Sequence, residues 1–233
     1  MKLTWDVTPR AELREDDRDA LYSVATRVYT DVARPTFESD LAEKDFVIRL
    51  RDEANVLRGF STLRVYPSHL GEEPVDVLFS GDTAIDPEAW GTPALPHAWL
   101  WTALRHRAQS DRPLWWLLLA GGYRTYRYMT VFFARGWPRY DTPLPPGLGA
   151  FRDRLAHERY GARYRDGIVH LEGAPLREEL AAAGDLRARV DPHVAWYFAA
   201  NPGHVRGDEL VCLTEIDPGN LTDAGRRILR AVT

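Results

Sequence analysis

Residues 75–137 read VDVLFSGDTAIDPEAWGTPALPHAWLWTALRHRAQSDRPLWWLLLAGGYRTYRYMTVFFARGW, and their pattern decides the fold. The run at 75–80 predicts a strand, and a Gly/Pro-rich turn after it leads into an apolar helical pattern. The uninterrupted apolar run at 114–120 predicts a central strand covered on both faces. Gly121 and Gly122 end that strand, and a second, aromatic helix follows. This order of strand, helix, strand and helix predicts a mixed α/β fold.

The residues before this stretch predict further elements of the same layered design. A helix at 19–33 is expected to end at Arg34-Pro35, because the residue before a proline is pushed out of the helical region. A loop at 67–74 is expected to lead into the strand at 75–80. The remaining expected elements are a strand at 3–7, a short helix at 36–44, and a hairpin of strands at 46–50 and 56–66.

Composition sets limits on the class of protein. The chain has 233 residues, 45% apolar and 27% charged, which is ordinary for a globular protein with its own core. No apolar run approaches the length of a membrane span and the N-terminus lacks the apolar segment of a signal peptide, so we expect a cytoplasmic protein without membrane contact. The net charge of −4 disfavours nucleic-acid binding. Cys212, the single cysteine, excludes an internal disulfide, and no residue spacing predicts a metal site.

Three landmarks of the sequence resemble the GNAT acyltransferase superfamily. They are VLRGFSTL at 56–63, the Ile85-Asp86-Pro87 step, and Gly136-Trp137 after the second helix. The resemblance covers residues 1–140 and implies a GNAT-like mixed central sheet flanked by helices. A Pro/Gly-rich linker at 142–149 follows it. Residues 141–233 are expected to form an α+β C-terminal extension that completes or covers this core, with further helices at 151–165 and 176–186.

The resemblance also implies the chemistry. GNAT enzymes transfer an acyl group from a pantetheine thioester to an amine, so acyl-CoA or acyl-phosphopantetheine is the expected co-substrate and a small-molecule amine the acceptor. Their phosphate-binding loop uses glycines and unpaired N–H groups at a helix start. Here Trp90, Pro93 and Leu95 replace the usual loop residues, and proline has no N–H to donate. Three explanations follow: a donor borne by an acyl carrier protein, free CoA held by unusual contacts, or a catalytically silent GNAT-like binding module.

The expected donor-binding residues surround the two helix starts. The turn after the strand at 75–80 contributes small residues and an indole. The glycines after the strand at 114–120 suit a close approach of another chain. The two arginines of the following helix suit a phosphate or an acidic carrier protein. These residues are Ile85, Trp90, Gly91, Thr92, Gly121, Gly122, Arg124 and Arg127.

The expected catalytic residues depart from the GNAT pattern. Phe132 stands where GNAT enzymes have the tyrosine that protonates the departing thiolate, so Tyr126 is the expected substitute, with Tyr123 and Tyr128 as alternatives. Asp82, beside Ser80 at the end of the strand at 75–80, is the expected general base. An open slot between this strand and the strand at 114–120 would favour an enzyme, whereas aromatic side chains filling it would favour the silent module.

Overall fold

The structure, a computed structural model, describes residues 1–170 and 190–230. Within this part, eight strands form one sheet in the order β1-β2-β3-β4-β5-β8-β7-β6, in which β4 and β5 are parallel and the other neighbours antiparallel. The strands are β1 (Thr4–Pro9), β2 (Phe46–Arg51), β3 (Leu57–Leu70), β4 (Glu73–Ile85), β5 (Leu114–Ala120), β6 (Tyr164–Arg165), β7 (Ile168–Val169) and β8 (Glu209–Ile216).

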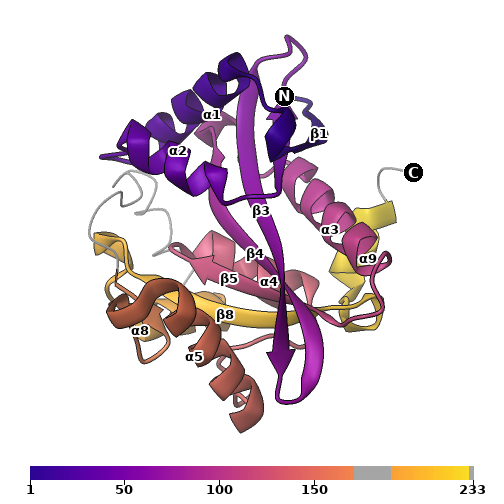
Figure 1. The fold of residues 1–233 in the computed structure, drawn as a ribbon, viewed down its shortest axis with the longest axis vertical. Coiled ribbons are helices and arrows are strands. Elements are labelled where there is room, and N and C mark those ends of the chain that lie inside the picture. Colours follow the sequence, from indigo (N-terminus) through magenta and orange to yellow (C-terminus); the bar gives the residue numbers. More distant parts are fainter. Residues whose placement is uncertain (171–189, 231–233) are drawn as a thin grey trace.

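Helices cover both faces of this sheet (Figure 1). The cores beneath them show that α1, α2 and α5 pack on one face, whereas α3, α4, α8 and α9 pack on the other. The predicted mixed α/β class is therefore confirmed. The helices are α1 (Glu15–Val28), α2 (Arg34–Ala42), α3 (Ala94–Arg107), α4 (Tyr123–Phe132), α5 (Pro146–Tyr160), α8 (Pro192–Ala200) and α9 (Asp223–Arg230).

The strand β4 carries a bulge and then separates from β5. The register with β3 shifts between the pairs Leu63↔Ser80 and Ser61↔Thr83, so that β4 has one residue more than β3 in this interval. Its pairing with β5 ends at Ser80↔Leu118. We call the region beyond this pair, residues 81–85 of β4 and 119–120 of β5, the β4–β5 divergence. It lies at the carboxyl ends of two parallel strands, where α/β sheets place their ligands.

Two expectations about the first half of the chain were wrong. The loop expected at 67–74 is absent, because β3 and β4 continue to a tight turn in which Gly71 has a φ of +60°. A glycine adopts this left-handed conformation without strain. Pro35 does not end α1 but lies in the first turn of α2, where its missing N–H leaves no bond unmade.

Gly136 lies beyond the end of α4 and does not cap it. The helix is capped by Phe133 with a φ of −118°, so no left-handed residue is needed there. A Cβ on Gly136 would lie 2.7 Å from Cγ of Met129, closer than Cβ atoms approach other atoms in proteins, and 3.1 Å from Cβ of Thr214, which is a tight contact. Packing between α4 and β8 therefore favours glycine at this position.

The residues after 141 supply a central part of the sheet. The strand β8 pairs with the whole length of β5, from Leu114↔Ile216 to Ala120↔Leu210. The helix α5 begins at Pro146, inside the stretch expected to be a linker, and the helix expected at 176–186 lies outside the described residues. Among the described helices, none combines the length and the apolar character needed to cross a membrane.

Candidate functional site

A carboxylate from the C-terminal part of the chain lies at the β4–β5 divergence. Because β8 runs antiparallel to β5 and pairs Leu210 with Ala120, the preceding residue, Glu209, lies beside Gly121. A Cβ on Gly121 would be 3.1 Å from Oε1 of Glu209, so the glycine leaves room for the carboxylate. Glu209 is in the first position of β8 and its side chain is partly exposed.

The proton affinity of Glu209 is unusual for a glutamate. Burial disfavours the charged form, and the nearby charge of Asp82 adds to the effect, so the pKa rises to about 7. Among the described residues, no hydrogen-bond or ion-pair partner occupies its carboxylate. A carboxylate with such a pKa can accept a proton at neutral pH, as a general base must.

The predicted base, Asp82, is already engaged. It lies in the β4 bulge, where its Oδ2 is 3.2 Å from Nζ of Lys44, and its side chain is 40% exposed. The Lys44 ammonium also donates to the backbone oxygen of Asp40 at 3.0 Å. Asp82 is thus half of an ion pair beside the site, whereas the Glu209 carboxylate has no partner among residues 1–170 and 190–230.

Tyrosines and a third carboxylate surround Asp82 and Glu209. The Tyr29 hydroxyl donates to the backbone oxygen of Thr83 at 2.7 Å, and the Tyr160 hydroxyl accepts from Arg159 Nε at 3.3 Å. Burial raises the pKa of both tyrosines, and the charges of the two carboxylates raise it further. The pKa of Asp40 is raised by burial and by Asp82. The α1, α2 and α5 face beside the divergence therefore carries three carboxylates and two tyrosine rings, together with the cations of Lys44 and Arg159.

Ser80 is the last residue of β4 that pairs with β5, so it lies next to the β4–β5 divergence and not within it. Its side chain is buried, and its Oγ accepts a hydrogen bond from Nε1 of Trp116 at 2.7 Å. The Trp116 ring packs against Trp99 with ring centroids 4.0 Å apart. Aromatic side chains therefore form the floor of the divergence on the α3 and α4 face, while 81–85 of β4 remain unpaired with β5.

Tyr126 lies in the core between α4 and α8. It is fully buried, its hydroxyl donates to the Pro138 oxygen at 3.1 Å, and its ring stacks on Trp196 and Tyr197. Burial raises the pKa of this hydroxyl far above its ordinary value. A proton donor for a departing thiolate has to reach the substrate, and a hydroxyl in this position does not.

We expect Tyr126→Phe to leave turnover unchanged and to lower the free energy of unfolding by about 1 kcal/mol, the usual contribution of one hydrogen bond. Urea denaturation and steady-state kinetics with any productive donor measure the two effects. A large loss of kcat in a fully folded variant would return Tyr126 to the list of proton donors.

Three of the predicted donor-binding residues lie together at the starts of α3 and α4. The Trp90 indole donates to the oxygen of Ile85, the last residue of β4, at 3.0 Å. The Arg124 guanidinium lies over the Trp90 ring, 4.3 Å from its centroid. Arg124 is exposed, and no carboxylate among the described residues is paired with it. This stack connects the turn before α3 with the first turn of α4.

The other predicted donor-binding residues are divided between the site and the scaffold. Gly91, with a φ of +82°, and Gly122, which caps α4, both have open space where a side chain would be. The Thr92 hydroxyl donates to the Ala89 oxygen at 3.1 Å. Arg127 faces away from this group, because its Nε is 3.0 Å from Asp191, the capping residue of α8. It stabilises the contact between α4 and α8 and is not free for a phosphate.

The strand order decides the fold. Four antiparallel strands are followed by a parallel β4–β5 pair that separates beside a bulge in β4, with helices starting at both sides of the separation. The fold is GNAT-like. Its predicted sheet and flanking helices are thereby confirmed.

No protein-family model and no curated protein sequence matches this chain. Among solved structures, its GNAT-like fold is similar to three acyltransferases at low identity. A probable N-acyltransferase from Enterococcus faecalis V583 has 12% identity and a TM-score of 0.44 over 74% of this chain and 45% of that chain. The ribosomal-protein-S18-alanine N-acetyltransferase from Escherichia coli has 15% identity and a TM-score of 0.41 over 59% and 83%. An acyl-CoA N-acyltransferase from Pseudomonas aeruginosa has 19% identity and a TM-score of 0.37 over 60% and 93%. At these identities, activity has to be argued from the residues of the chain itself.

Sequence reasoning missed two charged residues at the β4–β5 divergence. Glu209 gave no local sign of its place beside Gly121, because that place depends on a pairing between distant segments. Lys44 was the last residue of the short helix expected at 36–44, a position that does not predict burial, yet it is 4% exposed. The charge of Glu209 directly before the apolar run at 210–213 was the one available signal.

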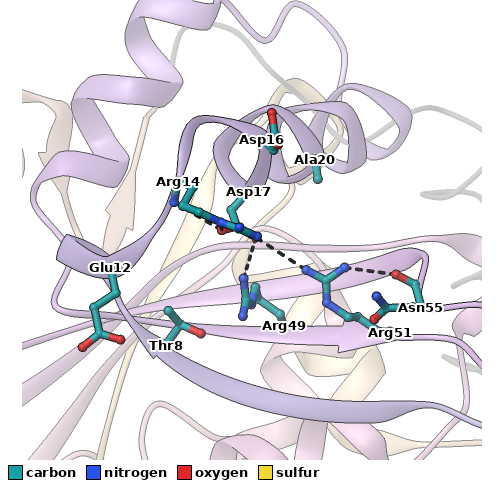
Figure 2. A pocket seen from close by; sticks show the side chains of 9 residues that line it. All are labelled: Thr8, Glu12, Arg14, Asp16, Asp17, Ala20, Arg49, Arg51 and Asn55. Carbon is teal, nitrogen blue, oxygen red and sulfur yellow. Dashed lines mark hydrogen bonds and ion pairs between the residues drawn. The ribbon is translucent and has the colours of Figure 1, made fainter.

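A surface pocket of about 560 Å³ lies away from the β4–β5 divergence, at the start of α1 over β1 and β2 (Figure 2). Its centre is an ion-pair network in which Asp17 faces Arg14, Arg49 and Arg51, at 3.6, 2.7 and 3.6 Å. These charges neutralise each other and connect α1 to β2, so the pocket is part of the scaffold. Within residues 1–170 and 190–230, no group of three potential metal ligands gathers at any point.

Proposed function

We propose that this chain is an acyltransferase that moves an acyl group from a pantetheine thioester to an amine of a small-molecule acceptor, with Glu209 as the general base. One observation carries the proposal: a carboxylate without a partner among the described residues, with a pKa of about 7, lies where β4 and β5 separate. An amine nucleophile has to lose its proton before attack, and such a carboxylate accepts protons at neutral pH.

The proposed reaction is a direct transfer. The Glu209 carboxylate removes a proton from the acceptor ammonium, and the amine nitrogen attacks the thioester carbonyl carbon. A C–N bond forms, the C–S bond breaks, and the sulfur leaves as a thiolate. The second proton lost by the nitrogen neutralises the thiolate, so the products are an amide, a free thiol and one proton taken up by Glu209. The carboxylates of Asp82 and Asp40, with the tyrosine rings beside them, support a cationic acceptor.

The donor is expected to enter on the α3 and α4 face. Arg124 offers a cation above Trp90 that is paired with no carboxylate among the described residues, and both CoA and a carrier-borne phosphopantetheine carry a phosphate for it. Proline at positions 93 and 96 removes two N–H donors from the helix start, which favours a donor that needs fewer phosphate contacts, such as one on an acyl carrier protein.

We expect Arg124→Ala to raise the KM for the acyl donor about tenfold with little change in kcat, because one charge-assisted hydrogen bond contributes roughly 1.5–3 kcal/mol. Arg105→Ala is the matched control, since Arg105 also lies over an indole, that of Trp101 on α3, at 4.9 Å. Steady-state kinetics with varied donor concentration measure both variants. An equal increase in KM in both would remove Arg124 from the donor site.

The experiment that tests the activity is incubation of the protein with acyl-CoA and with acylated carrier protein, each with a panel of primary amines. Mass spectrometry of the products detects the amide. Transfer from the carrier alone supports the carrier-borne donor, equal transfer from both defeats that version, and no amide from either donor overturns the proposal.

A catalytically silent binding module is the second candidate. The carbonyls at the ends of both separating strands are occupied: Trp90 Nε1 donates to Ile85, and the Tyr197 hydroxyl donates to Ala120 at 3.0 Å. A GNAT-like fold that satisfies these groups internally has fewer sites for a pantetheine chain. Calorimetric titration with CoA separates the candidates, because binding without turnover of its acyl form would favour the module.

A further inference from the structure

Lys44 is a buried charge next to the β4 bulge. It follows α2, its side chain is only 2% exposed, and its ammonium is 3.2 Å from Oδ2 of Asp82 and 3.0 Å from the oxygen of Asp40. Taking an ammonium out of water is costly unless opposite charge and hydrogen bonds compensate for it. The partner, Asp82, is much more exposed than Lys44, so the pair does not serve to shield a buried carboxylate.

The bulge itself is shaped for this lysine. A Cβ on Gly81 would lie 2.9 Å from Cε and 3.0 Å from Nζ of Lys44, and 3.1 Å from the Phe79 ring. The lysine side chain therefore lies directly against the backbone of Gly81. A glycine at this position leaves room for the ammonium beside the next residue, Asp82, and a side chain here would displace it.

The charge of Asp82 acts on the candidate base. Glu209 on β8 and Asp82 on β4 both raise the pKa of Tyr29, at the end of α1, and of Tyr160 on α5, and Glu209 also raises that of Tyr197 on α8. The cations on this face are Lys44 and Arg159. Burial is the main cause that raises the pKa of Glu209, and the charge of Asp82 raises it further. The position of the Asp82 carboxylate therefore contributes to how strongly Glu209 holds a proton.

We propose that Lys44 is a positioning residue for the general base: it holds the Asp82 carboxylate in the β4 bulge, where the Asp82 charge acts on Glu209. The inference rests on the proposed function in that Glu209 is the base of the reaction. Lys44 contacts neither substrate nor donor in this proposal. Without it, the exposed carboxylate of Asp82 turns toward solvent and its effect on Glu209 is lost.

The test is a titration of Glu209 itself, by carbon-13 NMR of glutamate side chains assigned with Glu209→Gln. We compare the wild type with Lys44→Met, Asp82→Asn and the double variant. Asp82→Asn keeps an acceptor for Lys44 but removes the charge, so the Glu209 midpoint is expected to fall by about half a pH unit or more. Lys44→Met is expected to lower the midpoint in the same direction, and to have no further effect when Asp82 is already asparagine.

Two more variants complete the test. Gly81→Ala keeps both charges but displaces the Lys44 ammonium, so it is expected to lower the midpoint as Lys44→Met does. Lys2→Met removes a cation at the N-terminus and is expected to leave the midpoint unchanged. An unchanged or raised midpoint in Lys44→Met, or an equal shift with and without Asp82, overturns the inference. These titrations need no turnover, so they separate this inference from the proposed activity, which Glu209→Gln tests.

Discussion

Glu209→Gln is expected to lower kcat by roughly 10²- to 10⁴-fold at pH 7.5, the usual contribution of a general base. Glutamine has nearly the same shape as glutamate but cannot accept the proton of the attacking ammonium. Burial and the charge of Asp82 raise the pKa of Glu209 to about 7, so the wild-type kcat should rise with pH through this value as the carboxylate becomes charged. The variant should lose this dependence.

Glu215→Gln is the matched control, because Glu215 lies on the same strand at its other end, 3.8 Å from Arg135. It should keep the wild-type rate and pH profile. If Glu209→Gln is folded and turns over as fast as Glu215→Gln, Glu209 is not the base and the proposed mechanism fails.

Glu209→Gln should also stabilise the folded protein above pH 7. The Glu209 pKa is about 7 in the folded state, above the ordinary glutamate value of 4.5, so the folded state binds the proton more tightly than the unfolded state. The free energy of unfolding therefore falls as pH rises from about 4.5 to 7, and the loss is complete above 7. Glutamine carries no charge, so Glu209→Gln should gain roughly 1–3 kcal/mol at pH 8 and nothing at pH 4. Denaturant melts at the two pH values measure this difference.

Trp116→Ala is expected to lower the free energy of unfolding by about 3–5 kcal/mol, as truncation of a large core aromatic residue does. Trp116 is 3% exposed, packs against Trp99 and Phe133, and donates to Ser80 at the floor of the β4–β5 divergence. The variant loses this packing and leaves the Ser80 hydroxyl without its donor. Urea denaturation followed by circular dichroism measures the loss.

Trp101→Ala provides the comparison, since Trp101 is 37% exposed on α3 and its removal leaves no buried cavity. Its cost should stay below about 1 kcal/mol, as is usual for surface positions. Similar losses in both variants would mean that the aromatic floor does not support the sheet. Trp116→Phe keeps a ring and removes the N–H, so it separates packing from the hydrogen bond to Ser80.

Local sequence patterns predicted much of the fold. The apolar run at 114–120 coincides with β5, and the strand expected at 46–50 coincides with β2, because period and turn residues are local signals. The longer hairpin of β3 and β4 was missed since prolines at 67 and 74 looked like loop residues. In the structure both lie in paired strands near the exposed end of the hairpin, where a missing N–H is tolerated.

The candidate site was less predictable, because it depends on which strand lies beside β5. Asp82 and Trp90 could be found from their place at the ends of local elements. Glu209 could not, since nothing local indicates that residues 209–216 insert next to β5 rather than at an edge. Tyr126 was chosen as a substitute for the tyrosine missing at position 132, and its place on the helix does not say whether α8 covers that face.

The pairing of β8 with β5 also bears on how this protein is synthesised. A ribosome completes β5 almost ninety residues before it begins β8, since β5 ends at Ala120 and β8 begins at Glu209. During that interval the strand LWWLLLA has an edge without a partner, the kind of edge that promotes association between chains. A nascent chain at this stage also lacks Glu209. Solubility during synthesis and the arrival of the proposed base therefore depend on the same late segment.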